Sequence, residues 1–199
     1  MERQSLDEKG LVKRINRGDK EAFRSLVCAY KGLVAHIVFR MVPSKADGED
    51  LCQDVFLKVY TSLPSFRFQS KLSTWIGRIT YNTCLNYLGK KKPVLVGDND
   101  SEESFWDSVP GDYPQPDHDY AAKNIADILH HEIDGMPAKY RIVLTLYHLE
   151  EMSYREITDI TGLPEGTVKS YLFRGRKYLK DQLDKKYGRE CYGFRTLQR

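Results

Sequence analysis

A helix–turn–helix pattern across residues 153–183 constrains the fold of this chain more than any other feature. Ser153 with Glu156 three residues later is a capping-box pattern, which opens a short helix. Gly162 stands where a helix ends in a left-handed residue, and Pro164 suits the first position of the next helix. In that second helix the predicted buried stripe follows the 3.6-residue period: Val168, Leu172, Gly175, Leu179 and Leu183.

The outward surface of the second helix is basic. Between residues 166 and 180 there are five Lys or Arg residues and no Asp or Glu. Such a helix suits a DNA major groove, where Thr and Ser reach base edges and Arg and Lys bind phosphates or guanine. A solvated basic face on an ordinary helical hairpin is the alternative interpretation. The outward residues are Thr167, Ser170, Arg174 and Lys177, flanked by Lys169, Tyr171, Arg176 and Lys180.

The charges of the chain divide it into blocks. Residues 1–93 carry 17 basic and 9 acidic residues, residues 94–121 carry 8 acidic residues and no basic one, and residues 122–199 carry 14 basic and 11 acidic residues. Two basic blocks around an acidic strip indicate two nucleic-acid-facing domains on a tether. We predict an N-terminal domain at 1–93, a flexible acidic linker at 94–120, a C-terminal domain at 121–186 and a basic tail at 187–199.

Composition argues against several other classes of protein. No apolar run approaches the roughly 18 residues that a membrane span requires, which argues against direct membrane insertion. The N-terminus is charged from Glu2 onward, without an apolar signal core, which predicts a cytoplasmic protein. The four cysteines form no C-x-x-C pair, so we expect no metal, cofactor or redox site: Cys28, Cys52, Cys84 and Cys191.

Two helices are predicted in the N-terminal half before residue 63. Residues 21–41 keep strict helical spacing and predict a long core helix. Residues 44–62 predict a second helix, with Asp47, Asp50 and Asp54 on one outward face beside an exposed Leu57. Acidic residues in the first turn interact favourably with the helix dipole, which is one explanation. A docking surface for a basic helix is a second, because an acidic and apolar strip suits it. A magnesium site is a third possibility, but no phosphate-cradling loop accompanies the acids.

Aromatic and basic residues alternate in the next segment. Loop 65–71 contains Phe66, Arg67 and Phe68, and it precedes a helix predicted at 72–88. Rings on which bases stack, with cations for the backbone, are what unpaired DNA requires. Trp75 lies on the apolar face of the helix, where a role in the core is the competing interpretation.

Three stretches resemble bacterial sigma factors of the extracytoplasmic-function (ECF) type. Residues 50–56, DLCQDVF, resemble the family's D-L-x-Q-D/E-x-F segment, and residues 73–82, STWIGRITYN, resemble its S-T-W-L-x-R-I-A-x-N segment. Residues 136–141, 153–157 and 164–170 resemble the family's domain for the minus-35 promoter element. The chain departs from the family at Tyr171, where Arg is frequent, at Gly175, where Ala is usual, and at Asn86, where Asp is common.

The resemblance implies an all-α protein of two small helical domains that directs core RNA polymerase to promoter DNA. It implies contacts with the clamp helices of the largest polymerase subunit and the flap of the second-largest subunit, inhibition by an anti-sigma factor, and no small-molecule substrate. The implied polymerase-binding residues are Asp50, Gln53, Asp54 and Leu57. The implied minus-ten residues are Phe66, Arg67, Phe68, Lys71, Trp75, Arg78 and Asn82. The implied minus-35 residues are Thr167, Lys169, Ser170, Tyr171, Phe173, Arg174 and Lys177.

Two other classes of function compete with this interpretation. A stand-alone helix–turn–helix regulator would bind duplex DNA without polymerase, and it would leave the aromatic and basic cluster at 66–92 without a purpose. An enzyme acting on DNA would need a Ser or Tyr nucleophile in an Arg cluster, or grouped metal-binding carboxylates. Neither arrangement is found in the sequence, so we predict that the protein is not an enzyme.

Overall fold

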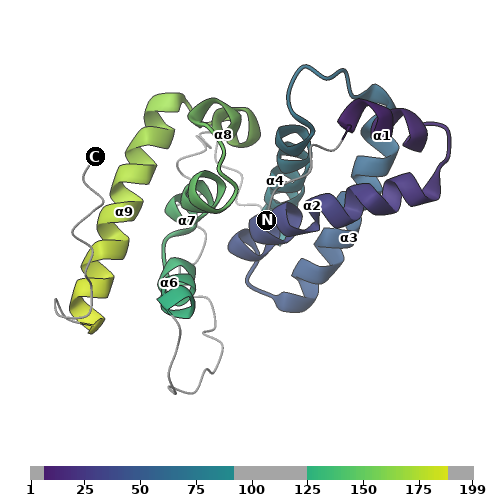
Figure 1. Cartoon of the computed structure of the whole chain (residues 1–199). Coiled ribbons are helices and arrows are strands. Elements are labelled where there is room, and N and C mark those ends of the chain that lie inside the picture. The colour runs from purple at the N-terminus through teal and green to yellow at the C-terminus, as the bar shows by residue number, and fades with distance from the viewer. Residues whose placement is uncertain (1–6, 92–124, 188–199) are drawn as a thin grey trace.

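The computed structural model describes residues 7–91 and 125–187, and in these ranges all regular structure is helical (Figure 1). The all-α prediction is therefore confirmed. The predicted linker at 94–120 and the tail beyond residue 187 lie outside the described residues. The elements are α1 (Glu8–Ile15), α2 (Lys20–Met41), α3 (Lys45–Ser62), η1 (Leu63–Ser65) and α4 (Leu72–Lys91), then α6 (Ile125–Asp134), α7 (Ala138–Leu144), η2 (Thr145–Leu149), α8 (Tyr154–Thr161) and α9 (Glu165–Tyr187).

Helix α2 is the central helix of the N-terminal unit, which comprises α1 to α4. It packs against α1, α3 and α4, and the carboxylate of Asp19 caps its start by accepting the N–H of Ala22 at 3.0 Å. Within the described residues, α2 is the one helix that is long and apolar enough to cross a membrane, by length and composition only. Its fully buried apolar side chains are Leu26, Val34, Ile37, Val38 and Met41.

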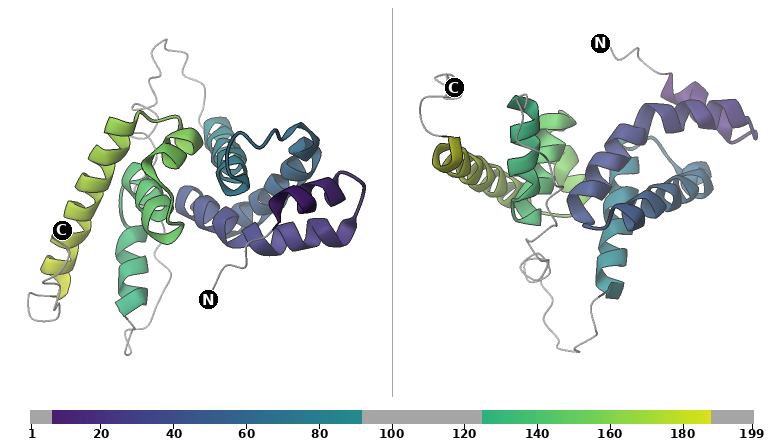
Figure 2. Two further views of the ribbon diagram at one scale, coloured as in Figure 1. Left: turned by 45° about the horizontal axis from the view of Figure 1, so that its top comes forward. Right: turned by 90° about the horizontal axis from the view of Figure 1, so that it is seen from below.

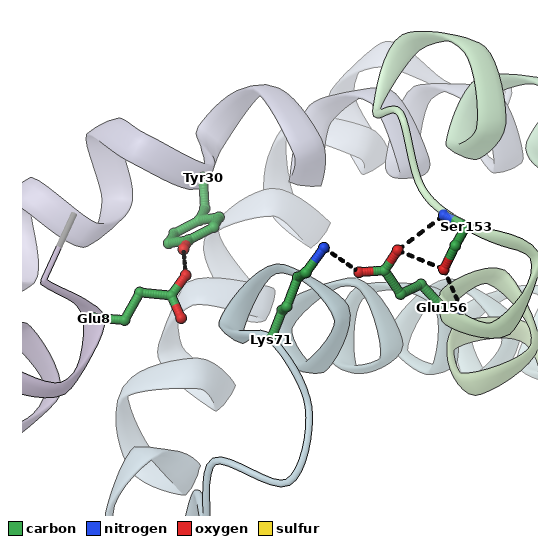
Figure 3. A network of polar contacts seen from close by, with 5 residues as sticks. All are labelled: Glu8, Tyr30, Lys71, Ser153 and Glu156. Carbon is green, nitrogen blue, oxygen red and sulfur yellow. Dashed lines mark hydrogen bonds and ion pairs between the residues drawn. The ribbon is translucent and has the colours of Figure 1, made fainter. Parts of the chain in front are cut away.

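Helix α1 was not anticipated from the sequence. Asp7 caps it by accepting the N–H of Gly10, and its apolar side pairs with α2. The hydroxyl of Tyr30 on α2 donates to Glu8 at 2.8 Å, which fixes the start of α1 (Figure 3). Its buried side chains are Leu11, Val12 and Ile15.

The C-terminal unit, α6 to α9, contains the predicted helix–turn–helix. The capping box of Ser153 and Glu156 is formed at the start of α8, and Gly162 ends that helix with a φ of 76°. Gly175 lets α9 approach α7 closely, because a Cβ placed there would lie 3.0 Å from the Leu144 side chain. The predicted capping box and the predicted left-handed residue at Gly162 are confirmed.

Residues 138–149 form two consecutive helical segments of different kinds. Helix α7 ends at Leu144, and a π-turn, η2, follows it from Thr145 to Leu149. A π-turn holds more residues per turn than an α-helix, so it changes the direction of the side chains that follow. Tyr147, the third residue of η2, is half-buried.

The two units lie against each other. Helix α8 packs on α4, and α7 and η2 pack on α2, as the views in Figure 2 show. The contact of α8 with α4 is close at Gly77, where a Cβ would lie 2.8 Å from Cδ1 of Ile160. Nearby, Nδ1 of His36 lies 2.6 Å from a carboxylate oxygen of Glu150.

Buried charge also lies between the units. Arg40 of α2 pairs with Asp134 at the end of α6, and the Arg141 guanidinium donates to the Asp134 carbonyl at 2.5 Å. Burial, followed by repulsion from Arg141, lowers the pKa of Arg40 to about 10. Two buried guanidinium groups therefore converge on one residue at this contact.

Candidate nucleic-acid interface

The outer face of α3 forms an acidic and apolar strip. The side chains of Asp50, Gln53 and Asp54 are exposed, and Leu57 beside them is 65% exposed. Asp47 differs from these residues, because its carboxylate accepts a hydrogen bond from the Tyr87 hydroxyl at 2.5 Å. The structure thus brings the four predicted polymerase-binding residues together and assigns Asp47 to packing within the unit.

The loop between η1 and α4 carries an aromatic cluster. The ring of Phe66 is 8% exposed and lies 4.7 Å from the Phe68 ring and 5.0 Å from the Trp75 ring, between centroids. Phe68 is 38% exposed and has a φ of 56°, a conformation that a bulky side chain seldom adopts. We expected both phenylalanines to face DNA. Phe66 is instead buried within the cluster. The Phe68 ring is partly exposed, with Lys9 Nζ 6.0 Å from its centroid.

Polar residues surround this cluster at the start of α4. Arg67 is exposed in the loop, and Arg78 and Asn82 are exposed one turn apart on α4. Lys71 lies at the boundary with the C-terminal unit, where its Nζ is 2.9 Å from Oε1 of Glu156 (Figure 3). Exposed cations, an exposed amide and an exposed ring therefore occur together here, as unpaired DNA requires.

Helix α9 presents a polar and cationic face. Phe173 is 70% exposed, and four of the other predicted residues are exposed with it, while Thr167 is half-buried. The Ser170 hydroxyl donates to the Gly166 carbonyl at 2.9 Å, and Lys169 Nζ lies 2.6 Å from Glu165. The four exposed residues are Lys169, Ser170, Arg174 and Lys177.

Tyr171 does not belong to this face. Its side chain is 3% exposed and its ring lies edge-on to that of Tyr140, with 5.6 Å between centroids. Our expectation that Tyr171 reaches DNA does not fit this burial, so we omit it from the proposed contacts. Its physical role is to pack α9 against α7.

The sequence interpretation missed a second group of aromatic and cationic residues beside α9. Tyr147 and Tyr154 stack on each other, and Arg176 lies over the Tyr147 ring. The seven-residue spacing of Lys169 and Arg176 was a detectable signal, since it places both on one side of the helix. The π-turn that carries Tyr147 to this group has no comparable signal in the sequence.

In the described ranges Cys28 is exposed, Cys52 is half-buried and Cys84 is buried. No group of three or more His, Cys, Asp or Glu residues could hold a metal ion there. Burial raises the pKa of Cys84 to about 12, which keeps this thiol protonated at neutral pH. Cys191 lies outside the described residues.

Two protein families match the chain, one on each unit. Residues 26–94 match the family described as Sigma-70 region 2, and residues 126–179 match the family described as Sigma-70, region 4. The region 2 match contains the α3 strip and the aromatic loop, and the region 4 match contains the helix–turn–helix up to Leu179.

Similar proteins cover most of the chain. The ECF RNA polymerase sigma-E factor of Escherichia coli strain K12 is 35% identical over 184 residues, which is 90% of this chain and 96% of that protein. The ECF RNA polymerase sigma factor SigW of Bacillus subtilis strain 168 is 31% identical over 176 residues, which is 86% of this chain and 94% of that protein.

Two solved structures share the fold. The sigma factor RpoE of Bartonella quintana, in complex with the anti-sigma factor NepR, has a TM-score of 0.62 at 21% identity, covering 81% of this chain and 96% of that chain. CnrH in complex with the cytosolic domain of CnrY has a TM-score of 0.60 at 19% identity, covering 88% of this chain and 96% of that chain.

Proposed function

The chain belongs to the ECF family of RNA polymerase sigma factors, and we propose on this premise that it binds core RNA polymerase and directs initiation at promoters with minus-ten and minus-35 elements. One observation carries the proposal. The region 2 and region 4 matches occur in order on one chain, each on a unit with its own exposed candidate surface. A stand-alone helix–turn–helix regulator would have no use for region 2, so that alternative is rejected.

The α3 strip is the proposed polymerase contact. Asp50, Gln53 and Asp54 present acceptors around the exposed apolar side chain of Leu57. Such a strip is complementary to a basic helix with an apolar stripe, which is how we propose that it docks on the clamp helices of the largest subunit. We propose a second contact, between the C-terminal unit and the flap of the second-largest subunit, from the family resemblance alone.

The aromatic loop and α4 are the proposed minus-ten site. Phe68 offers an exposed ring for stacking with an unpaired base. Phe66 packs against that ring and also against the Trp75 ring. Arg67 and Lys71 supply positive charge for the backbone of the displaced strand. The polar edge of α4 completes the site with Arg78 and Asn82.

Helix α9 is the proposed reader of the minus-35 element in duplex form. The hydroxyl groups of Thr167 and Ser170 lie near its start, where a recognition helix meets base edges. Arg174 is exposed one turn beyond Ser170, and bidentate contact with guanine is the commonest specific role of an arginine in the major groove. The apolar contact with a thymine methyl group is proposed for Phe173, and phosphate contacts for Lys169 and Lys177.

An anti-sigma factor is the proposed regulatory partner. RpoE and CnrH were solved with the anti-sigma factor NepR and with the cytosolic domain of CnrY, respectively. We also propose that this chain works in the cytoplasm, as a non-catalytic subunit of the polymerase.

Transcription with purified components tests the proposal. The chain is added to core polymerase on a library of genomic fragments, and start sites are read by sequencing. We expect a set of start sites that share two upstream elements and disappear without the chain. An unchanged start-site pattern would reject the proposed function.

A charge reversal on the α3 strip tests the docking surface. Asp54→Lys should abolish co-purification with core polymerase and leave the helical circular dichroism unchanged. Asp184→Lys, the same reversal at an exposed site in the last turns of α9, is the matched control and should still co-purify. Retention of Asp54→Lys on core polymerase would show that the strip is not the docking surface.

A further inference from the structure

Two tyrosines, a histidine and two cations form a compact group on the C-terminal unit, here called the tyrosine–cation cluster. Tyr147 of η2 and Tyr154 of α8 stack with 5.3 Å between ring centroids and 15° between ring planes. The Arg176 guanidinium lies 5.3 Å from the Tyr147 centroid, and Lys169 Nζ lies 5.4 Å from the Tyr154 centroid. The Arg176 Nε donates to Nε2 of His148 at 3.2 Å.

The cluster lies along one side of the proposed recognition helix. Lys169 and Arg176 are seven residues apart on α9, two helical turns, so both point from the same side. Both are exposed, beside the face that carries Ser170 and Arg174. When a recognition helix lies in a major groove, the phosphates line the groove on either side of its base-reading face. Cations on the flank of α9 therefore face phosphodiester groups.

The cluster holds Arg176 in a fixed place. An arginine on a surface loses side-chain entropy when it binds, and a side chain that is already held loses less. The Tyr147 ring supports the face of the guanidinium and His148 accepts from Nε, while among the described residues no hydrogen bond engages the Nη groups. Those groups carry donors in the fork geometry that suits phosphate oxygens.

The protonation state of His148 fits this arrangement. Its Nε2 can accept from Arg176 only while that nitrogen carries no proton. Burial, followed by the charge of Arg176, lowers the pKa of His148 below its ordinary 6.5. The histidine is therefore neutral at physiological pH and can remain an acceptor.

Resting on the function proposed above, we propose that Tyr147, Tyr154 and His148 are positioning residues that hold Arg176 and Lys169 against the phosphodiester backbone of the duplex beside the minus-35 element. The tyrosines touch no base in this arrangement. They act through the two cations, and Lys169 exchanges its ion pair with Glu165 for the phosphate.

The salt dependence of DNA binding tests the proposal. Holoenzyme, assembled from core polymerase and the full chain, is titrated with a duplex that carries the upstream element of a promoter found in the transcription assay. The logarithm of DNA affinity falls linearly with the logarithm of salt concentration. Removing the charge that neutralises one phosphate makes this line less steep, by about 0.9 in slope. We expect that decrease for Arg176→Gln, and none for Lys185→Gln, which removes the same charge in the last turn of α9.

The ring of Tyr147 is tested with a pair of variants. Tyr147→Phe keeps the ring and should bind as the unaltered chain does. Tyr147→Leu removes the ring, and it should bind about two- to five-fold more weakly, with a lower salt slope. The double variant Tyr147→Leu/Arg176→Gln should bind no more weakly than Arg176→Gln alone, because the ring acts through the arginine.

Three results separate the possible failures. An unchanged salt slope in Tyr147→Leu, or additive effects in the double variant, would overturn the positioning role and leave the cluster as part of the fold only. If Tyr147→Leu does not fold, His148→Ala replaces it as the test of the positioning role, because His148 is exposed. We expect His148→Ala to make the salt dependence less steep, as Tyr147→Leu would. If holoenzyme with the unaltered chain does not bind the duplex at any salt concentration, the proposed function itself is contradicted.

Discussion

Lys71 and Glu156 join the two units directly, with 2.9 Å between Lys71 Nζ and Glu156 Oε1 (Figure 3). Lys71 lies in the proposed minus-ten site, and Glu156 closes the capping box of α8 through two contacts with Ser153. One carboxylate therefore fixes the start of the first helix of the helix–turn–helix and also engages a cation of the proposed minus-ten site. A phosphate that binds Lys71 competes with Glu156 for the same ammonium group.

Removing this ion pair should loosen the contact between the units. Lys71 is largely exposed, so solvent screens the pair and its contribution is small, about 0.5 kcal/mol. Some amides of α4 and α8 exchange their hydrogens only when the units separate. Lys71→Ala should therefore speed hydrogen exchange at these amides by about twofold. Arg67→Ala, at an exposed neighbour in the same loop, is the control. Identical exchange in the unaltered chain and in Lys71→Ala would mean that the pair does not hold the units together.

The same carboxylate makes the stability of the chain depend on pH. Burial raises the pKa of Glu156, but hydrogen bonds from the Ser153 backbone and from Lys71 outweigh it and hold the pKa below its ordinary 4.5. A carboxyl group whose pKa is lower in the folded state contributes stability above its unfolded pKa. That contribution is lost as the pH falls through the folded pKa.

Thermal melts at a series of pH values measure this contribution. Glu156→Gln retains an acceptor for the cap but carries no charge, so its melting temperature should fall less on acidification below about pH 4.5 than that of the unaltered chain. Because other carboxyl groups titrate in both proteins, the difference between the two curves is the quantity to compare. Parallel curves would show that Glu156 contributes no stability through its charge.

Substitutions of the two phenylalanines in the aromatic loop should distinguish a role in stability, for Phe66, from a role in strand opening, for Phe68. Phe66 is buried, so Phe66→Ala should lower the free energy of unfolding by about 3 kcal/mol. Phe68 is more exposed, and Phe68→Ala should cost less than about 1 kcal/mol. Urea denaturation measures both. In a permanganate assay of open complexes, Phe68→Ala should show reduced strand opening, and normal opening would assign its ring to packing alone.

Local features of this chain were predictable from sequence because they depend on neighbours along the chain. The capping box at Ser153, the left-handed Gly162 and the acidic strip around Asp54 follow from spacing alone, and all three are present. Contacts between distant elements were not predictable in this way. Tyr171 is buried because Tyr140 of another helix covers it, and Phe66 because it packs against Trp75. Helical periodicity does not distinguish such a covered position from an open one.

The close approach of α7 and α9 provides a test of packing. A Cβ at Gly175 would lie 3.0 Å from Leu144 Cδ1 and 3.3 Å from the Tyr140 Cβ. Gly175→Ala should be nearly neutral, because the better helix propensity of Ala, about 1 kcal/mol, offsets the crowding. Gly175→Val adds a whole isopropyl group at a position where the Cβ alone is already crowded, and it should lower the free energy of unfolding by about 1–3 kcal/mol.

The matched control for this prediction is Gly32 of α2, where a Cβ would meet no atom within 4 Å. Gly32→Val should leave the midpoint of urea denaturation unchanged or raise it slightly, since Val has the better helix propensity and meets no neighbour. If Val changed the midpoint of urea denaturation equally at both positions, the Leu144 side chain would be able to move aside without cost. In that case the effect at Gly175 would reflect the backbone alone, and the usual alanine of the family would fit there without any adjustment of α7.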